Sequence, residues 1–310
     1  MVKCSFCDSK AILVRKYEGI ALCQKHFLRS VEKKIRKTIR VNKLIKRGDV
    51  IALGLSGGKD SSLLCWFLST IRKRYSINIV AITVDEGIGK YREKNIKCAK
   101  ELAKKYGIEH HVFSFKEEVG LRLEEIMKNK AIIEQCMSAC SVCSVLRRYI
   151  LNKKARELGA NKLAIAHNLD DESQSIFISY IRGDIPRALR LGPISPENDK
   201  SKFIRRIKPL LDIPEKETAL FSMLKNFKLV SGECPNAKFS FRWKVRDIIL
   251  GLEQTSPGTR YSIIKNFEKI RGVLIKAQKS KTKPLVCKMC GEPTSKEYCK
   301  YCQIIKLIGN

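Results

Sequence analysis

The stretch over residues 50–67, VIALGLSGGKDSSLLCWF, constrains the possible folds of this chain most strongly. Its first six residues form a short apolar run of the kind that fits a buried parallel strand. Gly57 and Gly58 then allow strained dihedrals and a close approach of the backbone to a ligand. Apolar residues recur at helical spacing after Asp60, so the stretch predicts a strand, a tight turn and a helix. Free N–H groups at such a helix start bind anions, and Lys59 stands where its ammonium group can meet phosphate oxygens.

The net charge of the chain indicates a polyanionic partner. The sequence has 62 Lys and Arg residues against 31 Asp and Glu residues, a formal net charge of +31 that is spread along the whole chain. Because each neutralised phosphate releases counterions, we favour nucleic acid as that partner. General solubility, or a proteome rich in lysine, would produce the same excess.

Length and cysteine content bound the class of protein. With 310 residues, 44% of them hydrophobic, we expect one main domain with small appendages. The first residues, MVKCSFCDSK, contain no apolar signal segment, and no run approaches the roughly 18 apolar residues of a membrane span. We therefore expect a cytoplasmic protein without membrane association. In a reducing compartment, clusters among its 13 cysteines predict metal ligands or catalytic thiols instead of disulfides.

The two cysteine-rich ends predict one zinc site each. Each end contains two knuckles with ligands three positions apart, which suits tetrahedral zinc. The N-terminal set is Cys4, Cys7, Cys23 and His26, and the C-terminal set is Cys287, Cys290, Cys299 and Cys302. Redox pairs are the alternative for the N-terminal set, and the histidine in fourth place argues against them. Between these first two knuckles we expect a hairpin that turns at Gly19, with zinc supplying the folding energy.

Periodic segments between the two ends predict an α/β fold with a doubly wound parallel sheet. Buried strands that alternate with amphipathic helices require parallel pairing. The expected strands cover residues 50–55, 77–84, 110–115, 162–166 and 203–210, with a further short one over 229–231. The expected helices cover residues 29–49, 90–107, 116–130, 173–181, 239–254 and 260–278, and two more begin at Pro214 and near Cys143. Residues 183–202 are expected to form a polar loop.

Ligands of open α/β sheets bind beyond the carboxyl ends of the strands, where two groups of residues are candidates. Backbone groups of Ile82 and Thr83 are placed to face an adenine, with Asp85 behind them. Asp170 and Asp171 follow the fourth strand and could hold Mg²⁺ on a nucleotide. Carboxylates in a first helical turn also cap the helix and oppose its dipole, but the position beside the phosphate loop favours the magnesium role.

Three cysteines lie in motifs away from the ends of the chain. Cys140 and Cys143 precede a helix that carries Arg147, and no second CxxC pair is near enough in sequence to close a zinc site. Cys234 follows the last expected strand, in the sequence GECP. The cysteines that match no motif, and that we expect to be buried structural thiols, are Cys65, Cys98 and Cys136.

The glycine-rich turn resembles the signature of the PP-loop ATP pyrophosphatases, which cleave ATP between the α- and β-phosphates and adenylate a carbonyl or carboxylate oxygen. Its spacing excludes the Walker loop, and six matching residues in a strand–turn–helix context argue against an ordinary turn. SGGKDS at 56–61, CSVC at 140–143, HNLDD at 167–171, GECP at 232–235 and the two cysteine-rich ends together resemble the TtuA-like tRNA 2-thiolation enzymes. The resemblance covers essentially the whole chain.

This resemblance implies the residues of the site. Cys140, Cys143 and Cys234 would ligate a 4Fe–4S cluster whose fourth iron keeps the open position that a catalytic metal site needs. A persulfide followed by a disulfide between Cys140 and Cys234 would use the same residues and is the alternative. The implied catalytic residues are Cys140, Cys234, Asp60 and Asp171. The implied contacts to ATP and Mg²⁺ are Gly54, Leu55, Ser56, Gly57, Gly58, Lys59, Asp60, Ser61, Ile82, Thr83, Arg147, Ala166, Asp170 and Asp171.

The implied reaction adenylates uridine O2 of tRNA and replaces it with sulfur to give 2-thiouridine, with the wobble uridine favoured over the T-loop uridine. Lysidine synthesis, cytidine 2-thiolation and a non-catalytic zinc-dependent RNA-binding protein are the alternatives. Relatives take sulfur from a ubiquitin-like carrier with a C-terminal thiocarboxylate or from inorganic sulfide, and commonly form homodimers. We expect tRNA on the basic helices and zinc modules, with its target base extruded into the pocket. The expected domains are the zinc module 1–28, the catalytic domain 29–255, a basic helix and linker 256–283, and the zinc ribbon 284–310.

Overall fold

The computed structural model describes residues 2–195, 204–230, 232, 234–278, 285–294 and 296–309. Within them, the main domain is built on a parallel sheet with the strand order β5-β4-β3-β6-β7. The strands are β3 (Val50–Gly54), β4 (Asn78–Asp85), β5 (Glu109–Ser114), β6 (Lys162–Ala164) and β7 (Arg205–Ile207). The order runs outward from β3 in both directions, so the sheet is doubly wound as predicted. Ligands of such sheets bind where the order reverses, at the carboxyl ends of β3 and β6.

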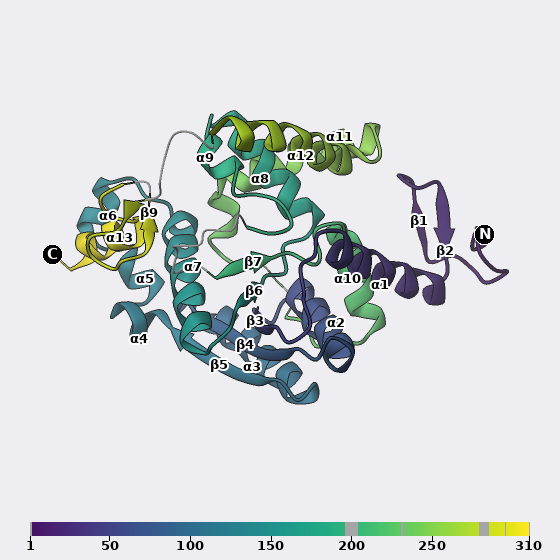
Figure 1. The fold of residues 1–310 in the computed structure, drawn as a ribbon, viewed down its shortest axis with the longest axis horizontal. Helices are drawn as coiled ribbons and strands as arrows, with labels where there is room; N and C mark the ends of the chain where they lie inside the picture. Colours follow the sequence, from purple (N-terminus) through teal and green to yellow (C-terminus); the bar gives the residue numbers. More distant parts are fainter. Residues whose placement is uncertain are drawn as a thin grey trace.

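Helices cover both faces of this sheet, and a further group of helices lies beyond β7 (Figure 1). One face carries α1 (Gln24–Val41), α2 (Lys59–Tyr75), α3 (Gly89–Lys105) and α10 (Glu215–Leu224), and the other carries α7 (Ala139–Glu157). The group beyond β7 consists of α8 (Leu169–Ile181), α11 (Phe241–Thr255) and α12 (Thr259–Gln278). Short helices are α4 (Phe115–Val119), α5 (Leu123–Ile126), α6 (Lys130–Glu134), α9 (Ile185–Ala188) and a 3₁₀ turn at Ala237–Phe239.

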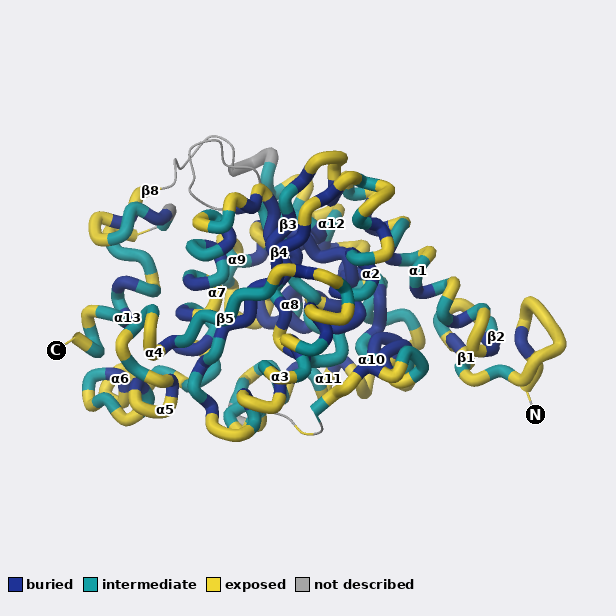
Figure 2. The backbone as a smooth tube through the Cα atoms, turned by 90° about the horizontal axis from the view of Figure 1, so that it is seen from below, coloured by how far each residue is buried: buried dark blue, intermediate teal, exposed yellow. Residues whose placement is uncertain are grey.

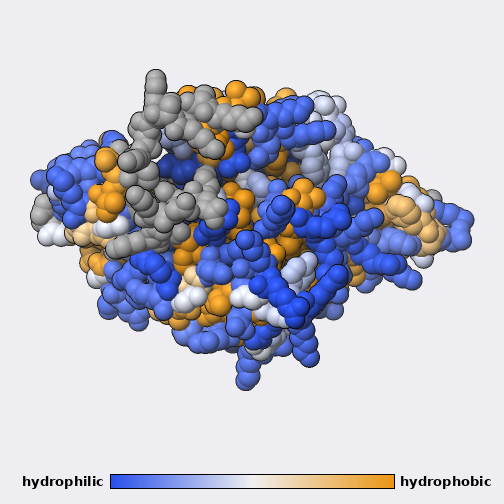
Figure 3. All heavy atoms as spheres, viewed as in Figure 1, coloured by the Kyte–Doolittle hydropathy of each residue, from blue (hydrophilic) through white to orange (hydrophobic). Residues whose placement is uncertain are grey.

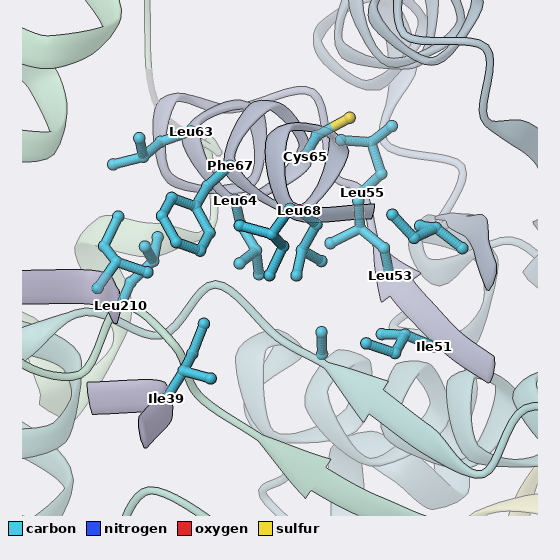
Figure 4. Packing of buried hydrophobic residues seen from close by; sticks show 14 of the residues in the cluster. Ile39, Ile51, Leu53, Leu55, Leu63, Leu64, Cys65, Phe67, Leu68 and Leu210 are labelled. Atoms are coloured by element: carbon cyan, nitrogen blue, oxygen red, sulfur yellow. The ribbon is translucent and has the colours of Figure 1, made fainter. Parts of the chain in front are cut away.

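The core follows from the alternation of side chains along the central strands. Ile51 and Leu53 of β3 point into the larger hydrophobic cluster, which α1, α2 and α10 complete, whereas Ala52 points to the α7 face. Figure 4 shows Leu64, Phe67 and Leu68 of α2 packed over these strand residues. The central strands are buried along their length (Figure 2), which is why their sequences are continuous apolar runs.

Four predictions about local structure were wrong. The single helix expected over residues 116–130 is interrupted, because Gly120 ends α4 with a φ of 92° and Asn129 caps the separate helix α6. The strand expected over 229–231 is absent at residues 229 and 230, while Ser231 lies outside the described residues. The expected loop over 183–202 contains α9; of the remainder, residues 196–202 lie outside the described part of the chain. The helix expected from Ser173 begins earlier, at Leu169, because Asn168 caps it.

The N-terminal module is the predicted hairpin, formed by β1 (Leu13–Arg15) and β2 (Ile20–Leu22) with Gly19 at a φ of 67°. It docks on the main domain through a buried ion pair. Arg15 donates from Nε and Nη2 to the Glu217 carboxylate of α10 at 2.9 and 2.6 Å, and Tyr17 donates to the same carboxylate at 2.5 Å. Lys34 of α1 extends this network by donating to the hydroxyl groups of Tyr17 and Tyr261.

The C-terminal module, formed by β8 (Leu285–Val286), β9 (Pro293–Thr294) and α13 (Lys300–Ile308), packs on α7. Tyr301 of α13 stacks on Tyr149 of α7, with 3.5 Å between ring centroids and an interplanar angle of 7°. Glu292 accepts from Asn152 and Arg156 on the same helix. The ribbon therefore supports the helix that begins with Cys140 and Cys143. None of the helices in the described part of the chain has the length and apolar character needed to cross a membrane.

Candidate functional site

The loop between β3 and α2 has the geometry of an anion site. Gly57 has a φ of 84°, and a Cβ atom on it would lie 2.0 Å from the backbone oxygen of Asn95, so only glycine fits. Ser61 Oγ donates to the Gly58 carbonyl at 3.0 Å and accepts from the Ser56 N–H at 3.2 Å, which closes the turn. Gly58 is the N-cap of α2 and has no side chain to satisfy the first N–H groups of the helix. These groups are therefore available to phosphate oxygens.

Charged groups from two other helices surround this loop. Lys59 lies between the carboxylates of Asp60 (3.2 Å) and Glu215 (2.8 Å), and this pairing raises the pKa of its ammonium group although burial opposes the rise. Asp60 accepts from Asn168 at 3.1 Å and from Thr218 at 2.5 Å. Burial raises the pKa of Asp60, with Asp171 adding to the rise and Lys59 opposing it. A carboxylate whose pKa is raised by a second carboxylate beside a phosphate site favours a cation between the two.

The two aspartates of HNLDD differ in their surroundings. Asp170 is buried, accepts from the N–H of Glu215 at 2.7 Å and pairs with Arg260, so its oxygens hold α10 and α12 in place. Asp171 accepts from the Asn168 N–H as part of a capping box, yet its side chain stays 37% exposed. Partial desolvation by the surrounding protein raises the pKa of Asp171, while Arg242, 3.8 Å away, opposes the rise. Asp171 is therefore the more open of the two for a metal or a substrate.

The expected adenine contacts lie inside the sheet. Ile82 and Thr83 are buried, and the Thr83 hydroxyl donates to the Leu55 carbonyl at 2.5 Å. Because the hydroxyl proton of Thr83 is used in that bond, the Thr83 oxygen can only accept a hydrogen bond from His110 Nε2, which lies 2.7 Å away. Burial lowers the pKa of His110 to about 4, so the ring is neutral at pH 7 and carries its proton on Nε2. A contact of this strand's backbone with adenine stays a prediction, as does that of Ala166, which follows β6 half-buried.

The three motif cysteines come from two segments and lie near one another. Cys140 and Cys143 occupy the first turns of α7, and Cys234 packs against the same hydrophobic cluster as Cys143. Cys140 Sγ donates to the Asn236 carbonyl at 3.3 Å, which ties the GECP segment to α7. Burial raises the pKa of Cys140, with Cys234 adding to the rise, and burial raises the pKa of Cys143 to about 12. A hollow of about 210 Å³ opens beside Cys140 and Asn236.

A chain of polar contacts runs from the phosphate loop to α7, the helix that carries Cys140 and Cys143. Arg92 of α3 donates to the Ser56 carbonyl at 3.0 Å and pairs with Glu86 at 2.7 Å. Glu86 also pairs with Arg147, at 3.2 Å, and the pKa of Cys143 responds to both of these charges. The loop and the cysteine helix are thus parts of one polar centre.

Both cysteine-rich ends bring their predicted ligands together. Among the described residues, sets of three or more potential ligand atoms lie within 4.8 Å of one another only at Cys4, Cys7, Cys23 and His26, and at Cys287, Cys290, Cys299 and Cys302. Tetrahedral zinc with bonds of about 2.3 Å places its sulfur ligands roughly 3.8 Å apart. The sulfur atoms are 3.7 Å apart for Cys7 and Cys23 and 3.6 Å apart for Cys290 and Cys299, so both sets fit zinc.

Several groups of this centre were missed from the sequence. Asp85, the predicted residue at the end of β4, accepts from the Gly87 N–H in a local turn. The residue that joins the polar centre is Glu86, directly after it, so the prediction from strand ends missed the functional carboxylate by one residue. Arg92, Glu215 and Thr218 lie in helices without a motif. The thiols of Cys65 and Cys98 are buried and half-buried, but the prediction that Cys136 is buried was wrong: it is exposed at a φ of 50°.

Taken together, the sheet and the loop define a nucleotide-binding α/β protein that receives phosphate at a glycine-rich helix start. A family model of the PP-loop domain matches residues 27–252, and a model of the N-terminal LIM domain of the 2-thiouridine synthetase TtuA matches residues 3–28. The chain therefore belongs to the PP-loop family, in its group of TtuA- and NcsA-like tRNA thiolases.

Individual relatives agree over the full length. The tRNA 2-thiolation protein NcsA of Haloferax volcanii is 34% identical, with 99% of both chains covered. The tRNA-5-methyluridine(54) 2-sulfurtransferase of Pyrococcus horikoshii is 29% identical over 97% of this chain and 93% of its own. The structure of the U34-tRNA thiolase NcsA from Methanococcus maripaludis with its [4Fe-4S] cluster superposes with a TM-score of 0.83 at 36% identity, covering 99% of this chain and 96% of that one.

Proposed function

We propose that this protein is an ATP-dependent tRNA sulfurtransferase that converts the wobble uridine of tRNA to 2-thiouridine. One observation carries the proposal: the phosphate loop, Asp171 and the three motif cysteines belong to one polar centre at the carboxyl edge of the sheet. ATP activation and sulfur transfer need different groups within reach of the same base, and this centre offers both.

In the first half-reaction, the adenylation of uridine, different residues of this chain bind the phosphates, the metal ion and the nucleotide. The N–H groups after Gly58 and the Lys59 ammonium bind the β- and γ-phosphates that leave as pyrophosphate. Asp60 and Asp171 hold Mg²⁺ on the nucleotide. Uridine O2 attacks the α-phosphate, and adenylation turns a poor leaving oxygen into AMP. Arg147, half-exposed and anchored by Glu86, is placed between this nucleotide and the cysteines.

The donor set fits a 4Fe–4S cluster better than a single ion. Cys140, Cys143 and Cys234 interact with one another, yet they fall outside the sets of described ligands that lie within 4.8 Å. They are therefore not gathered around one tetrahedral ion, which suits a larger centre, and three thiolates would leave one iron of a 4Fe–4S cluster without a protein ligand. When bound there, the cluster supplies a site that holds and activates inorganic sulfur for attack on C2 of the adenylated base. The three cysteines would hold it, and α7 fixes two of them.

The test begins with anaerobic purification, followed by measurement of iron, sulfide and zinc and by mass spectrometry of tRNA treated with protein, ATP and sulfide. We expect iron near four per chain and ATP-dependent 2-thiouridine. Cys234→Ala should lose the iron and the product while keeping zinc, and the exposed Cys136→Ala is the matched control that should lose neither. Zinc without iron, even after anaerobic reconstitution, would leave the persulfide–disulfide route of Cys140 and Cys234 instead.

The modified position and the sulfur donor are tested in the same assay. The wobble position is supported by the higher identity to the U34 thiolase, 36%, than to the 5-methyluridine(54) enzyme, 29%. Nuclease fragments that carry sulfur in the T-loop but not in the anticodon would refute this assignment. Comparing inorganic sulfide with a ubiquitin-like protein thiocarboxylate identifies the donor that supports turnover.

A further inference from the structure

Four arginines from three segments gather beside the site without a role in the reaction above. They are Arg148 of α7, Arg187 of α9, Arg190 shortly after α9, and Arg206 of β7, and we call them the arginine cleft. Hydrophilic side chains line the hollow between α9 and α7, where these segments meet (Figure 3).

Contacts between α7 and β7 explain how Arg148 and Arg206 come together. The Asn152 side chain of α7 accepts from the N–H of Ile204, just before β7, at 3.1 Å. Arg148 lies one helical turn before Asn152, and Arg206 lies two strand residues after Ile204. Both steps span roughly 5–7 Å toward the carboxyl edge of the sheet, because a crossover helix runs antiparallel to the strands. The two side chains therefore start from neighbouring positions at that edge.

The chain from α9 to Ser195 brings Arg187 and Arg190 to the same edge. Ser195 donates from its N–H to the Arg206 carbonyl and accepts from the Arg206 N–H with its hydroxyl, both at 2.9 Å. This pairing holds residues 191–195 along β7. Arg187 and Arg190 are three residues apart at the preceding helical turn and so lie on one side of it.

The charges of the cleft have no direct ion-pair partner among the described carboxylates, although Asp184 attracts Arg187 and Glu172 attracts Arg206 from farther away. Arg148 and Arg190 are exposed, and none of the four arginines forms an ion pair with a described carboxylate within 4 Å. Partial desolvation by the surrounding protein lowers the pKa of Arg148 to about 10, and repulsion from Arg206, Arg187, Arg147 and Arg190 adds to this shift. The group still carries its full positive charge at pH 7, so it presents a strong site for a polyanion.

We propose that the arginine cleft binds backbone phosphates of tRNA next to the nucleotide that is modified, an inference that rests on the proposed function. Planar guanidinium groups match phosphate oxygens in pairs. The cleft also adjoins both halves of the active centre: Arg148 follows Arg147, and Arg187 neighbours Arg242, which donates to the Asp171 carbonyl at 3.1 Å. Backbone phosphates of tRNA bound in the arginine cleft would hold an extruded uridine between the bound ATP and the cysteines.

The test measures equilibrium binding of tRNA to the intact holoprotein under anaerobic conditions, without ATP, at several salt concentrations. The variant is Arg187→Ala combined with Arg190→Ala. The control is Lys73→Ala combined with Arg74→Ala, which removes the same number of charges from an exposed site at the opposite end of the domain. We expect the cleft variant to bind tRNA at least tenfold more weakly, and the slope of log K against log salt to shrink by roughly 1–2. The control should stay within about threefold.

Arg190→Ala alone, at an exposed position, should give part of the same loss and guards against a folding defect. ATP affinity, measured separately, should be unchanged in all variants. Equal loss in the cleft variant and the control would refute the inference, as would lost ATP affinity with intact tRNA binding, which would assign the cleft to nucleotide phosphates. Unchanged tRNA binding with a lost response to an acidic sulfur-carrier protein would assign it to that protein and also refute the inference. If the wild type itself binds no tRNA, the proposed function fails with it.

Discussion

Substitution of Gly57 by alanine tests whether the phosphate loop needs glycine at this position for its backbone conformation and its close packing on α3. A Cβ atom at this position would lie 2.0 Å from the Asn95 backbone oxygen, against an ordinary contact of at least 3.4 Å, so α3 or the loop must move by about 1.4 Å. The φ of 84° adds strain that costs an L-residue roughly 1–2 kcal/mol. With about 1–3 kcal/mol for overpacking, we expect Gly57→Ala to lower the unfolding free energy by about 2–5 kcal/mol.

The neighbouring Gly58 provides the matched control within the same motif. Its φ is −87° and the nearest atom to an added Cβ is Ser56 Oγ at 3.6 Å, an ordinary contact. Gly58→Ala should therefore change the unfolding free energy by less than about 1 kcal/mol, the scale of an N-cap substitution. Chemical denaturation of both variants, read by circular dichroism, makes the comparison, and ATP titration shows whether Gly57→Ala has displaced the loop. Equal denaturation midpoints for the two variants would refute the reasoning.

Three further predictions concern other parts of the molecule. His110 has a pKa of about 4 in the folded protein and near 6.5 in the unfolded chain, so the unfolded chain binds more protons between these values. The unfolding free energy should therefore fall by about 2 kcal/mol from pH 7 to pH 5. Denaturation at a series of pH values should show a flatter dependence for His110→Gln. Tyr301→Ala removes the stack on Tyr149 and should speed hydrogen exchange in the first turns of α7, whereas Tyr298→Ala, on the same ribbon, should not; equal exchange would refute a supporting role. Cys7→Ala should lower zinc from two to one per chain by metal analysis, and an unchanged content would exclude the N-terminal site.

The sequence was informative where the signal is local. The strand, turn and helix around Gly57 were predictable because an apolar run, two glycines and a helical repeat lie within eighteen residues. Both zinc sets were predictable for the same reason, since ligand spacing within each knuckle is short. The prediction of one helix over 116–130 was wrong because it followed the apolar spacing and did not consider that Gly120 can end a helix in the left-handed conformation.

The parts of the site that escaped prediction depend on contacts between distant segments. Glu215 meets Lys59 across 156 residues of sequence, and Thr218 meets Asp60 across 158. No periodicity or motif encodes such a meeting, because it results from how α10 packs on α2. Likewise, the motifs named Cys143, but only the fold shows that Glu86 and Arg92 connect its helix with the phosphate loop.

The docking of the N-terminal hairpin has a consequence for how the chain is completed during synthesis. The hairpin and its metal ligands emerge from the ribosome first, and Arg15 pairs there with the half-exposed Glu18, but its buried partner Glu217 lies 202 residues later. At the usual rates of translation this delay is roughly 10–40 s. During it, an arginine that is buried in the finished protein has no buried carboxylate partner, so the module folds early and attaches late. Any chain truncated before α10 therefore carries a metal-binding module that lacks the buried carboxylate anchoring it to the main domain.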